Sequence, residues 1–380
     1  MTRRLMVMAA GTGGHIMPGL AVAEEMRGRG WTVTWLGTTT GMENRLVPAR
    51  GITLDTIGFG GLRGKGLWYA MTGGVRMLNA MRQSLSILRV RKPDAVLGMG
   101  GYATVPGGLM ASVVNVPLII HNADAAMLLS NRILAPVADR MSFGFASSAA
   151  KKYGKRAEVT GNPVRADIAL LPAPGQRFTN RSGPLRLLVV GGSLGARPLN
   201  RAVPSAIARM AVEQRPIVVH QTGANELDSV RNDYASNGVD AQRVECVAFI
   251  DDMAARYAEA DVVLCRAGAI TVAELAAAGV PSILVPLMLS TTSHQRDNAM
   301  HMAEGNAAIH LPQAEMTPES LAQHLSGLER GQLLAMASSA RALGRPDATR
   351  CVADVCERIA RRANGATAAP TTAANESKAP

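Results

Sequence analysis

Two glycine-rich turns, each after a short apolar run, constrain the fold of this chain more than any other feature. The first run, Leu5–Ala9, leads into Gly11-Thr-Gly-Gly-His15, and the second, Leu187–Val190, leads into Gly191-Gly-Ser-Leu-Gly-Ala196. A strand that ends in glycines and continues into a helix brings backbone N–H groups close to a phosphate or sugar. One such turn in each half predicts two nucleotide-type domains that face each other across a cleft.

Neither turn is a dinucleotide-binding fingerprint. Ile16 occupies the place of the third glycine in the first turn, and the glycines of the second turn have a different spacing. The expected strand Thr32–Leu36 is followed by Gly-Thr-Thr-Thr, with no acidic residue to hold a ribose hydroxyl. The sequence therefore disfavours a nicotinamide-dependent enzyme.

Composition limits the partners of the chain. With 380 residues it is long enough for two domains, and its net charge of +11 favours a polyanionic partner. Aromatic residues are only 3% of the chain, so the stacking side chains of a nucleic-acid surface are scarce. We expect instead a pyrophosphate substrate and an anionic membrane surface. The four cysteines lack metal-ligand spacing, and no secretory or membrane-spanning segment is evident, which favours a cytoplasmic protein with peripheral membrane contact.

Strand-like and helix-like runs alternate along the chain, which predicts an α/β protein with two doubly wound parallel sheets. The predicted strands are Leu5–Ala9, Thr32–Leu36, Ala95–Leu97, Leu118–His121, Leu187–Val190, Ile217–His220, Val244–Val247, Val262–Leu264 and Ser282–Val285. The predicted helices include Gly19–Arg29, Leu67–Arg91, Leu199–Glu213, Ala269–Ala278 and Ala348–Arg362. We expect an N-terminal domain at 1–163, a C-terminal domain at 164–345, a helix at 346–362 that packs back on the first domain, and a disordered tail at 363–380.

Several motifs, in order along nearly the whole chain, resemble those of the MurG family, the UDP-N-acetylglucosamine:undecaprenyl-pyrophosphoryl-muramoyl-pentapeptide N-acetylglucosaminyltransferases. They are G-T-G-G-H (11–15), P-G-L-A-V-A (18–23), G-L-R-G-K-G (61–66), L-G-M-G-G-Y (97–102), G-N-P-V-R (161–165), V-G-G-S-x-G-A (190–196), F-I-D-D-M (249–253), C-R-A-G-A-I-T-V-A-E-L (265–275) and H-Q-x-x-N-A (294–299). The resemblance implies the two-domain GT-B fold, UDP-GlcNAc as donor and lipid I as acceptor.

The second half carries the expected donor site. Backbone N–H groups of Ala269 and Ile270, after Gly268, could hold a pyrophosphate or sugar, and Glu274 could accept both ribose hydroxyls. The alternative for Glu274 is that it only complements the helix dipole. The resemblance adds a backbone contact of Ile250 with uracil and contacts of Gln295 and Asn298 with the donor sugar. The full predicted donor set is Thr12, Gly13, Gly14, Asp124, Arg165, Ser193, Ile250, Ala269, Ile270, Thr271, Val272, Ala273, Glu274 and Gln295.

The first glycine turn carries the expected acceptor site and reacting centre. His15 is the candidate catalytic base for an acceptor hydroxyl, or a cation that binds the acceptor pyrophosphate. Thr12 and Tyr102 are the other acceptor-side candidates, and Asn200, Arg266 and Asn298 are further candidate site residues. Because no Asp-x-Asp pair occurs, we expect no obligatory metal held by the protein. We also expect no cofactor.

One stretch departs from the family pattern. Where the family has His-Glu-Gln-Asn, this chain has His121-Asn-Ala-Asp124. The resemblance makes the position of Asp124 a contact with the donor sugar, and a carboxylate there accepts hydrogen bonds but donates none. We expect UDP binding to be intact and donor-sugar recognition to be altered.

The segment Gly58–Arg91 predicts membrane contact. Arg63 and Lys65 precede a helix with apolar residues such as Leu67 and Trp68, and apolar residues flanked by cations suit an anionic headgroup layer. We therefore expect an inverting glycosyltransferase that forms lipid II, bound peripherally at the cytoplasmic face of the bacterial inner membrane. The alternatives are an enzyme like UDP-GlcNAc 2-epimerase and a non-catalytic membrane-surface protein that binds a UDP-sugar.

Overall fold

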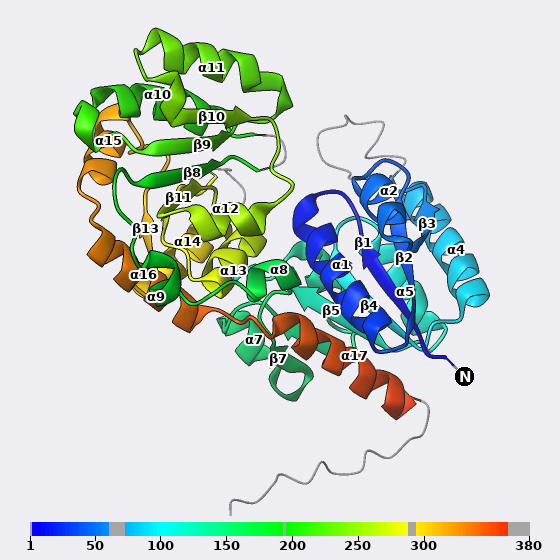
Figure 1. Ribbon diagram of the computed structural model, residues 1–380. Coiled ribbons are helices and arrows are strands. Elements are labelled where there is room, and N and C mark those ends of the chain that lie inside the picture. Colours follow the sequence, from blue (N-terminus) through cyan, green and yellow to red (C-terminus); the bar gives the residue numbers. More distant parts are fainter. Residues whose placement is uncertain (1, 61–72, 193–194, 288–293, 364–380) are drawn as a thin grey trace, which may run out of the picture.

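The structure, a computed structural model, describes residues 2–60, 73–192, 195–287 and 294–363, which form two α/β domains (Figure 1). The first domain contains a seven-stranded sheet in the spatial order β3 (Thr53–Ile57), β2 (Thr32–Thr38), β1 (Arg4–Ala9), β4 (Ala95–Gly100), β5 (Leu118–Asn122), β6 (Arg140–Phe143) and β7 (Ala157–Val159). The second contains a six-stranded sheet in the order β10 (Val244–Val247), β9 (Ile217–Gln221), β8 (Arg186–Val190), β11 (Val262–Cys265), β12 (Ser282–Leu284) and β13 (Ala308–His310). All neighbouring strands pair in parallel, so the predicted fold class is confirmed.

Helices cover both faces of the first sheet, because β1 is apolar along its length and alternate side chains point to opposite faces. Leu5 and Val7 pack in one core with α1 and α17. Met6 and Met8 pack in a second core with α4, α5 and α6. The helices of this domain are α1 (Gly13–Gly28), α2 (Glu43–Leu46), α4 (Gly73–Arg91), α5 (Thr104–Val113), α6 (Leu129–Leu134), α7 (Ser148–Lys152) and α17 (Ala348–Ala363).

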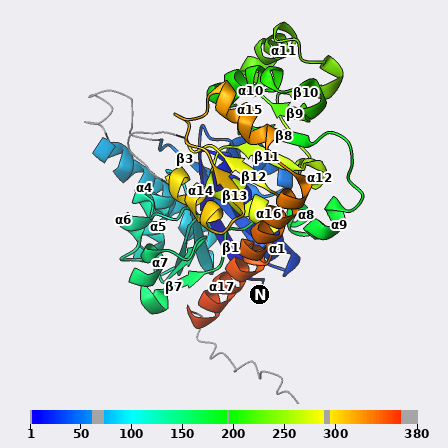
Figure 2. The same cartoon turned by 90° about the vertical axis from the view of Figure 1, so that its left-hand side faces the viewer.

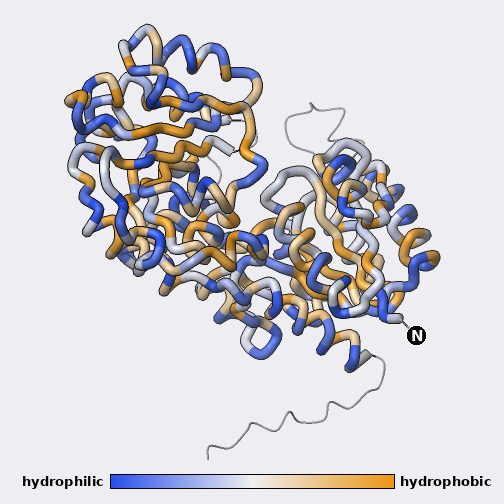
Figure 3. Tube along the Cα trace, viewed as in Figure 1, coloured by the Kyte–Doolittle hydropathy of each residue, from blue (hydrophilic) through white to orange (hydrophobic). Residues whose placement is uncertain are grey.

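The second sheet follows the same rule. Leu187 and Val189 of β8 pack with α10, α11 and α15, whereas Leu188 and Val190 pack with α12, α13 and α14. Figure 3 shows the hydrophobic colouring along the strands of this sheet, between the two helix layers. The helices of this domain are α8 (Ala166–Ala169), α9 (Pro174–Phe178), α10 (Arg197–Arg209), α11 (Leu227–Ser236), α12 (Met253–Glu259), α13 (Ala269–Ala278), α14 (His294–Glu304), α15 (Pro318–Ser326) and α16 (Arg330–Leu343).

The last helix, α17, returns from the second domain to the first and lies beside α1 (Figure 2). Val352, Cys356 and Ile359 are among its residues in the core that contains β1. At the surface of that core, the Trp31 indole N–H donates to Glu357 at 3.1 Å. The chain therefore crosses between the domains twice, once after β7 and once before α17.

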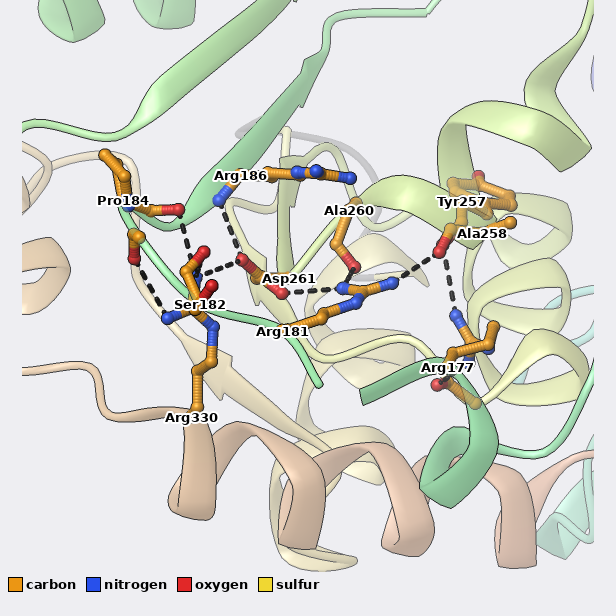
Figure 4. Close-up of polar contacts among 12 residues, drawn as sticks. Arg177, Arg181, Ser182, Pro184, Arg186, Tyr257, Ala258, Ala260, Asp261 and Arg330 are labelled. Carbon is orange, nitrogen blue, oxygen red and sulfur yellow. Dashed lines mark hydrogen bonds and ion pairs between the residues drawn. The ribbon is translucent and has the colours of Figure 1, made fainter. Parts of the chain in front are cut away.

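A buried acidic residue organises the amino-terminal edge of the second sheet, opposite the carboxyl ends of the strands (Figure 4). Asp261 accepts from the Arg181 guanidinium at 2.6 Å, from that of Arg330 at 3.3 Å and from the backbone N–H of Arg186 at 2.9 Å. The same Arg181 group donates to the carbonyls of Ala258 and Ala260 at the end of α12. A buried carboxylate is tolerated only when it is paired and hydrogen-bonded in this way.

The sequence-based elements were wrong in several places. The helix expected at Gly19 begins at Gly13, with Pro18 inside it, and the helix expected to end at Glu213 ends at Arg209. The expected helix start at Leu67 lies outside the described residues, as does the predicted tail from 364 onward. Four strands were not predicted, namely β3, β6, β7 and β13. Three of these have four residues or fewer, and β3 contains an acidic residue, so none presents a long apolar run.

We predict that Ile359→Ala destabilises the first domain, because a side chain that is 5% exposed leaves a cavity in the core. Truncations of this kind cost about 2–5 kcal/mol. Urea unfolding followed by tryptophan fluorescence would measure this cost, since all three tryptophans lie within the first 70 residues. The control is Ile133→Ala on α6, where the side chain is 46% exposed and the cost should be clearly smaller. Equal losses in both variants would contradict the packing role of α17.

Candidate active site

The strand order of each sheet reverses once, between β1 and β4 in the first domain and between β8 and β11 in the second. Consecutive loops at such a switch point leave toward opposite faces of the sheet, which opens a crevice at the carboxyl ends of the strands. The two predicted glycine-rich turns follow β1 and β8, and the motif that ends at residue 275 begins at the end of β11. Most of the predicted site residues therefore lie at the two switch points.

Three glycines shape the switch point of the first domain. Gly11, Gly100 and Gly101 have φ angles of +100°, +109° and +85°. A Cβ on Gly100 would lie 2.7 Å from the His15 ring, and one on Gly101 would overlap the Ala10 carbonyl. The turn after β4 can therefore approach the turn after β1 only because it lacks side chains.

The predicted acceptor-side residues surround this turn. Thr12 is exposed at the N-cap position of α1, and its side chain makes no capping hydrogen bond to a described residue. Gly13 and Gly14 open the helix, and Tyr102 is 50% exposed just after Gly101. The amino end of α1 is therefore accessible to an anionic ligand.

The His15 ring has one buried nitrogen and a lowered pKa. Its Nδ1 atom is buried and has no hydrogen-bond partner among the described residues. Burial lowers the pKa of His15 below its usual 6.5, and the nearby carboxylate of Asp124 acts in the opposite direction. The net effect is a neutral imidazole at pH 7, which is the form that accepts a proton.

The second switch point brings Arg165 and Glu274 together. Gly268 precedes α13, and the Glu274 carboxyl, 9% exposed, accepts from the Arg165 guanidinium at 3.3 Å and from the Tyr257 hydroxyl at 3.5 Å. Burial raises the pKa of Glu274 to about 6, although the charge of Arg165 acts to lower it. This carboxyl therefore titrates near neutrality, in the middle of a helix that begins directly after a glycine.

The other predicted donor residues differ in their accessibility. Ile250, shortly after β10, is 7% exposed, and Ala269 is 8% exposed, so either would offer mainly its backbone to a ligand. Gln295 accepts from the Leu287 backbone N–H at 2.9 Å. Val272 and Ala273 line a separate hollow of about 270 Å³, on the side of α13 that faces residues 144–146 and 342–345. Thr271 is half-buried, and Ser193 lies outside the described residues.

Two further candidates act as supports in this structure. The buried Asn200 amide donates to the Thr222 carbonyl at 2.9 Å and meets the His220 ring at 3.1 Å. A Cβ on Gly195 would overlap the same Thr222 carbonyl, so this network sits directly beneath the second glycine turn. Arg266 donates to the Gln313 side chain at 2.8 Å and to the Val285 carbonyl at 3.2 Å, which ties it to neighbouring loops.

Asn298, expected at the donor sugar, is fully buried between the domains. Its amide donates to the Ala267 carbonyl at 3.1 Å in its own domain and to the Asp124 carboxylate at 3.3 Å in the other. Its side-chain oxygen accepts from the Ala125 backbone N–H at 3.4 Å. Asn298 therefore joins the loop after β5 to the loop after β11.

A second asparagine, which the sequence analysis did not single out, makes a parallel link. Asn162 donates to the Ala123 carbonyl at 2.9 Å and to the Ala269 carbonyl at 3.5 Å. Its oxygen meets the His121 ring at 2.8 Å, and that ring meets the Ser142 hydroxyl at 2.9 Å. The only sequence signal was its place in G-N-P-V-R at the expected domain boundary. We refer to Asn162 and Asn298, with the loops they join, as the polar seam.

The polar seam brings two helix starts into one region. Helices α1 and α13, which begin at Gly13 and Ala269, contact each other. Helix N-termini favour negative charge, so two of them on opposite sides of a seam suit two phosphate-bearing ligands, one from each domain. Within the described parts of the chain, no group of three His, Cys, Asp or Glu side chains is placed to hold a metal ion.

Comparison with known proteins gives a consistent family. The glycosyltransferase family 28 N-terminal domain matches residues 5–143, and the family 28 C-terminal domain matches residues 186–351. A Methylibium petroleiphilum protein named UDP-N-acetylglucosamine–N-acetylmuramyl-(pentapeptide) pyrophosphoryl-undecaprenol N-acetylglucosamine transferase is 62% identical over 95% of this chain and 98% of its own length. A protein of the same name from a Janthinobacterium species is 56% identical over 94% of this chain and 99% of its own.

A solved structure agrees with these relatives. The crystal structure of Acinetobacter baumannii MurG has a TM-score of 0.78 and 36% sequence identity with this chain, and covers 94% of this chain and 100% of that one. The resemblance inferred from the motifs and the GT-B arrangement of the two domains are thereby confirmed.

We predict that Asn298→Ala lowers the free energy of unfolding of the chain. The substitution removes the hydrogen-bond partner of the Ala267 carbonyl, the Ala125 N–H and the Asp124 carboxylate in the seam. A fully buried polar group left unpaired, here the Ala267 carbonyl, costs about 1–3 kcal/mol, and the half-buried groups of Asp124 and Ala125 add less. Urea unfolding would measure the loss. Asn232→Ala, on the exposed face of α11, is the matched control, since it makes the same helical substitution without buried partners. A loss no larger than that of the control would contradict the polar seam.

Proposed function

The chain belongs to glycosyltransferase family 28, among the UDP-N-acetylglucosamine–N-acetylmuramyl-(pentapeptide) pyrophosphoryl-undecaprenol N-acetylglucosamine transferases, and from this membership we propose its reaction. It is a hexosyltransferase that transfers GlcNAc from UDP-GlcNAc to lipid I and forms lipid II for peptidoglycan. The observation that carries this conclusion is 62% identity with a named transferase over nearly the full length of both chains.

We propose that the second domain holds UDP-GlcNAc. The ionised Glu274 carboxylate accepts the two ribose hydroxyls, and its ion-pair partner, Arg165, contacts the base or a phosphate. Ile250 contacts uracil through its backbone, and the start of α13, residues 269–271, meets the diphosphate and sugar together with Gln295. Backbone N–H groups at a helix start stabilise the charge that develops on the leaving diphosphate. Ser193 has the same role from the second glycine turn.

In this proposal the first domain binds the acceptor and supplies the base. The 4-hydroxyl of the muramoyl residue attacks C1 of GlcNAc in one displacement, which inverts the anomeric carbon and releases UDP. The hydroxyl proton passes to His15, which is neutral at pH 7 because burial lowers its pKa. Thr12, Gly13, Gly14 and Tyr102 face the acceptor or the reacting centre.

Asp124 is the residue at which the proposed donor-sugar site of this chain departs from the family pattern. Its carboxylate accepts from Asn298, and the Asn122 amide donates to its backbone carbonyl at 2.7 Å, so both ends of the residue are held. A carboxylate at this point can accept from a sugar hydroxyl but cannot donate to a carbonyl. We therefore propose that Asp124 contacts hydroxyl groups of GlcNAc and leaves its acetamido carbonyl to other groups.

Exposed apolar side chains beside cations support attachment to a membrane surface. Val75 and Leu78 on α4 are 72% and 63% exposed, and Arg82 is exposed on the same helix. We propose that this face lies on the anionic cytoplasmic surface of the bacterial inner membrane, where lipid I is embedded. Of the described helices, none has the length and hydropathy to cross a bilayer. The predicted loop contacts at 61–72 lie outside the described residues.

The reaction is tested by transfer of radiolabelled GlcNAc from UDP-GlcNAc to a short-chain lipid I analogue in detergent, with UDP release followed in parallel. Transfer that depends on the analogue supports the proposal. Interconversion of the donor without acceptor would instead establish an epimerase, and UDP binding without either reaction would establish a non-catalytic binding protein.

We predict that His15→Ala lowers kcat by about 100-fold or more, the usual contribution of a general base, while UDP affinity stays unchanged. The base must be neutral, so wild-type kcat should fall as pH drops through a midpoint below 6.5. Asp124 raises the pKa of His15, so Asp124→Asn should move that midpoint still lower. Steady-state transfer rates between pH 5 and 8 would measure both effects. Transfer at the wild-type rate by His15→Ala would exclude it as the base.

We predict that UDP affinity weakens as pH falls through about 6, where Glu274 becomes protonated and loses acceptor capacity. Glu274→Gln should weaken UDP binding by roughly tenfold or more, since hydrogen bonds to a charged group contribute about 1.5–3 kcal/mol. Isothermal titration calorimetry at several pH values would measure both trends. The exposed Glu259→Gln on α12 should bind UDP as the wild type does. If Glu274→Gln retained wild-type affinity, Glu274 would only complement the helix dipole.

A further inference from the structure

A buried acidic residue in the first domain has no part in the donor or acceptor contacts proposed above. Glu43, the first residue of α2, is fully buried, with 0% of its surface exposed. Its carboxylate accepts three hydrogen bonds, from the Thr38 backbone N–H at 2.8 Å, the Thr38 hydroxyl at 2.7 Å and the Gly11 backbone N–H at 3.0 Å. One oxygen serves both Thr38 donors, and the other serves Gly11.

The segment that contains Glu43 holds both backbone polar groups of Gly11. Glu43 accepts from the Gly11 N–H, and the Met42 backbone N–H donates to the Gly11 carbonyl at 3.3 Å. Gly11 has a φ angle of +100° and lies two residues before the start of α1. Its conformation, and therefore the direction in which the chain enters α1, is fixed by residues that lie 31 and 32 positions away in the sequence.

The surrounding chain makes room for this carboxylate. A Cβ on Gly37 would lie 2.7 Å from the Glu43 side chain, and a Cβ on Gly41 would overlap the carboxylate itself. A buried carboxylate is costly, and an apolar residue of similar volume commonly replaces a buried charge without loss of stability. Packing alone therefore does not account for an acid at this position, whereas the orientation of the Gly11 N–H does.

We propose that Glu43 is a positioning residue for glycosyl transfer, which orients the first glycine turn toward the acceptor. By engaging the N–H of Gly11, it sets the path of the chain so that the start of α1 and the His15 ring face the substrate. The ligand class is the diphosphate-linked sugar acceptor, and the inference rests on the proposed function of this turn. The residues proposed to bind UDP lie in the other domain, and UDP affinity is expected to be independent of Glu43.

The test uses Glu43→Gln. Glutamine keeps the shape of the side chain, but its amide nitrogen cannot accept a hydrogen bond. Its one oxygen is favoured on the side of Thr38, which presents two donors, so the amide nitrogen faces the Gly11 N–H and that link is lost. We expect kcat/KM for the lipid I analogue to fall about tenfold or more, while UDP affinity stays within twofold of wild type. The assay is run without denaturant, with tryptophan fluorescence confirming that each variant is folded.

Thr38→Val is the matched control, because it removes a hydrogen bond to the same carboxylate but leaves the Gly11 contact in place. It should lower the urea midpoint, as Glu43→Gln does, yet retain transfer within twofold of wild type. If the two folded variants lost equal transfer activity, or if neither lost any, Glu43 would be structural and the inference would be overturned.

Amide hydrogen exchange over residues 10–16 provides a readout that does not depend on catalysis. Exchange there should be faster in Glu43→Gln than in Thr38→Val, and equal rates would overturn the inference even if the wild type showed no transfer. If the wild type itself showed no transfer, that result would contradict the proposed function and not the positioning role of Glu43.

If Glu43→Gln does not fold, Gly11→Ala serves in its place, since alanine is strained at a φ of +100° and disturbs the turn from its other side. It should show the same selective loss of acceptor kinetics, and wild-type kinetics would overturn the inference.

Discussion

The polar seam between the domains is the interaction on which the site depends. Each switch point alone is an ordinary crevice of a parallel sheet, and a reaction between two ligands needs the two crevices to face each other. Asn162 and Asn298 provide this, because each amide contacts the loop after β5 on one side. On the other side, Asn298 contacts the loop after β11 and Asn162 contacts the first residue of α13. Asparagine suits this position because one side chain both donates and accepts without bringing a buried charge.

Buried neutral histidines support this arrangement in both domains. Burial lowers the pKa of His121 to about 4 and that of His220 to about 3, so both rings stay neutral at pH 7. His121 meets Asn162 of the seam, and His220 meets Asn200 beneath the second glycine turn. His15 differs from both, because its Nδ1 atom lacks a partner among the described residues and a carboxylate, Asp124, acts on it. Two histidines thus hold asparagines in place, and the third, His15, is the one that we propose as the base.

The sequence was sufficient where a local pattern determines the structure. The helix predicted at Ala269–Ala278 has these bounds in the structure, because a glycine precedes it, its second half is a run of strong helix formers, and another glycine ends it. The apolar strands at the centre of each sheet were also predictable. The short edge strands β7 and β13 were not, since three residues that pair with one neighbour carry no periodic signal.

For the site, the motifs identified the switch-point loops but not the residues that support them. Asn298 was expected at the sugar, which stays a prediction. Its contacts in the seam could not be predicted, because the partners, Asp124 and Ala267, are distant in the sequence. Glu43 gave no signal at all, since a single acid after Gly41-Met is typical of a solvated turn. Its burial follows from contacts with Gly11 and Thr38 that only the assembled sheet creates.

The most direct test of a two-domain reaction site is hydrogen exchange with ligands added in sequence. UDP alone should slow amide exchange at residues 248–251 and 266–275 of the second domain and leave residues 10–16 unchanged. A lipid I analogue added next should slow exchange at residues 10–16 and 100–104 of the first domain. If UDP protected the first glycine turn and left α13 unprotected, the assignment of donor and acceptor to the two domains would be contradicted.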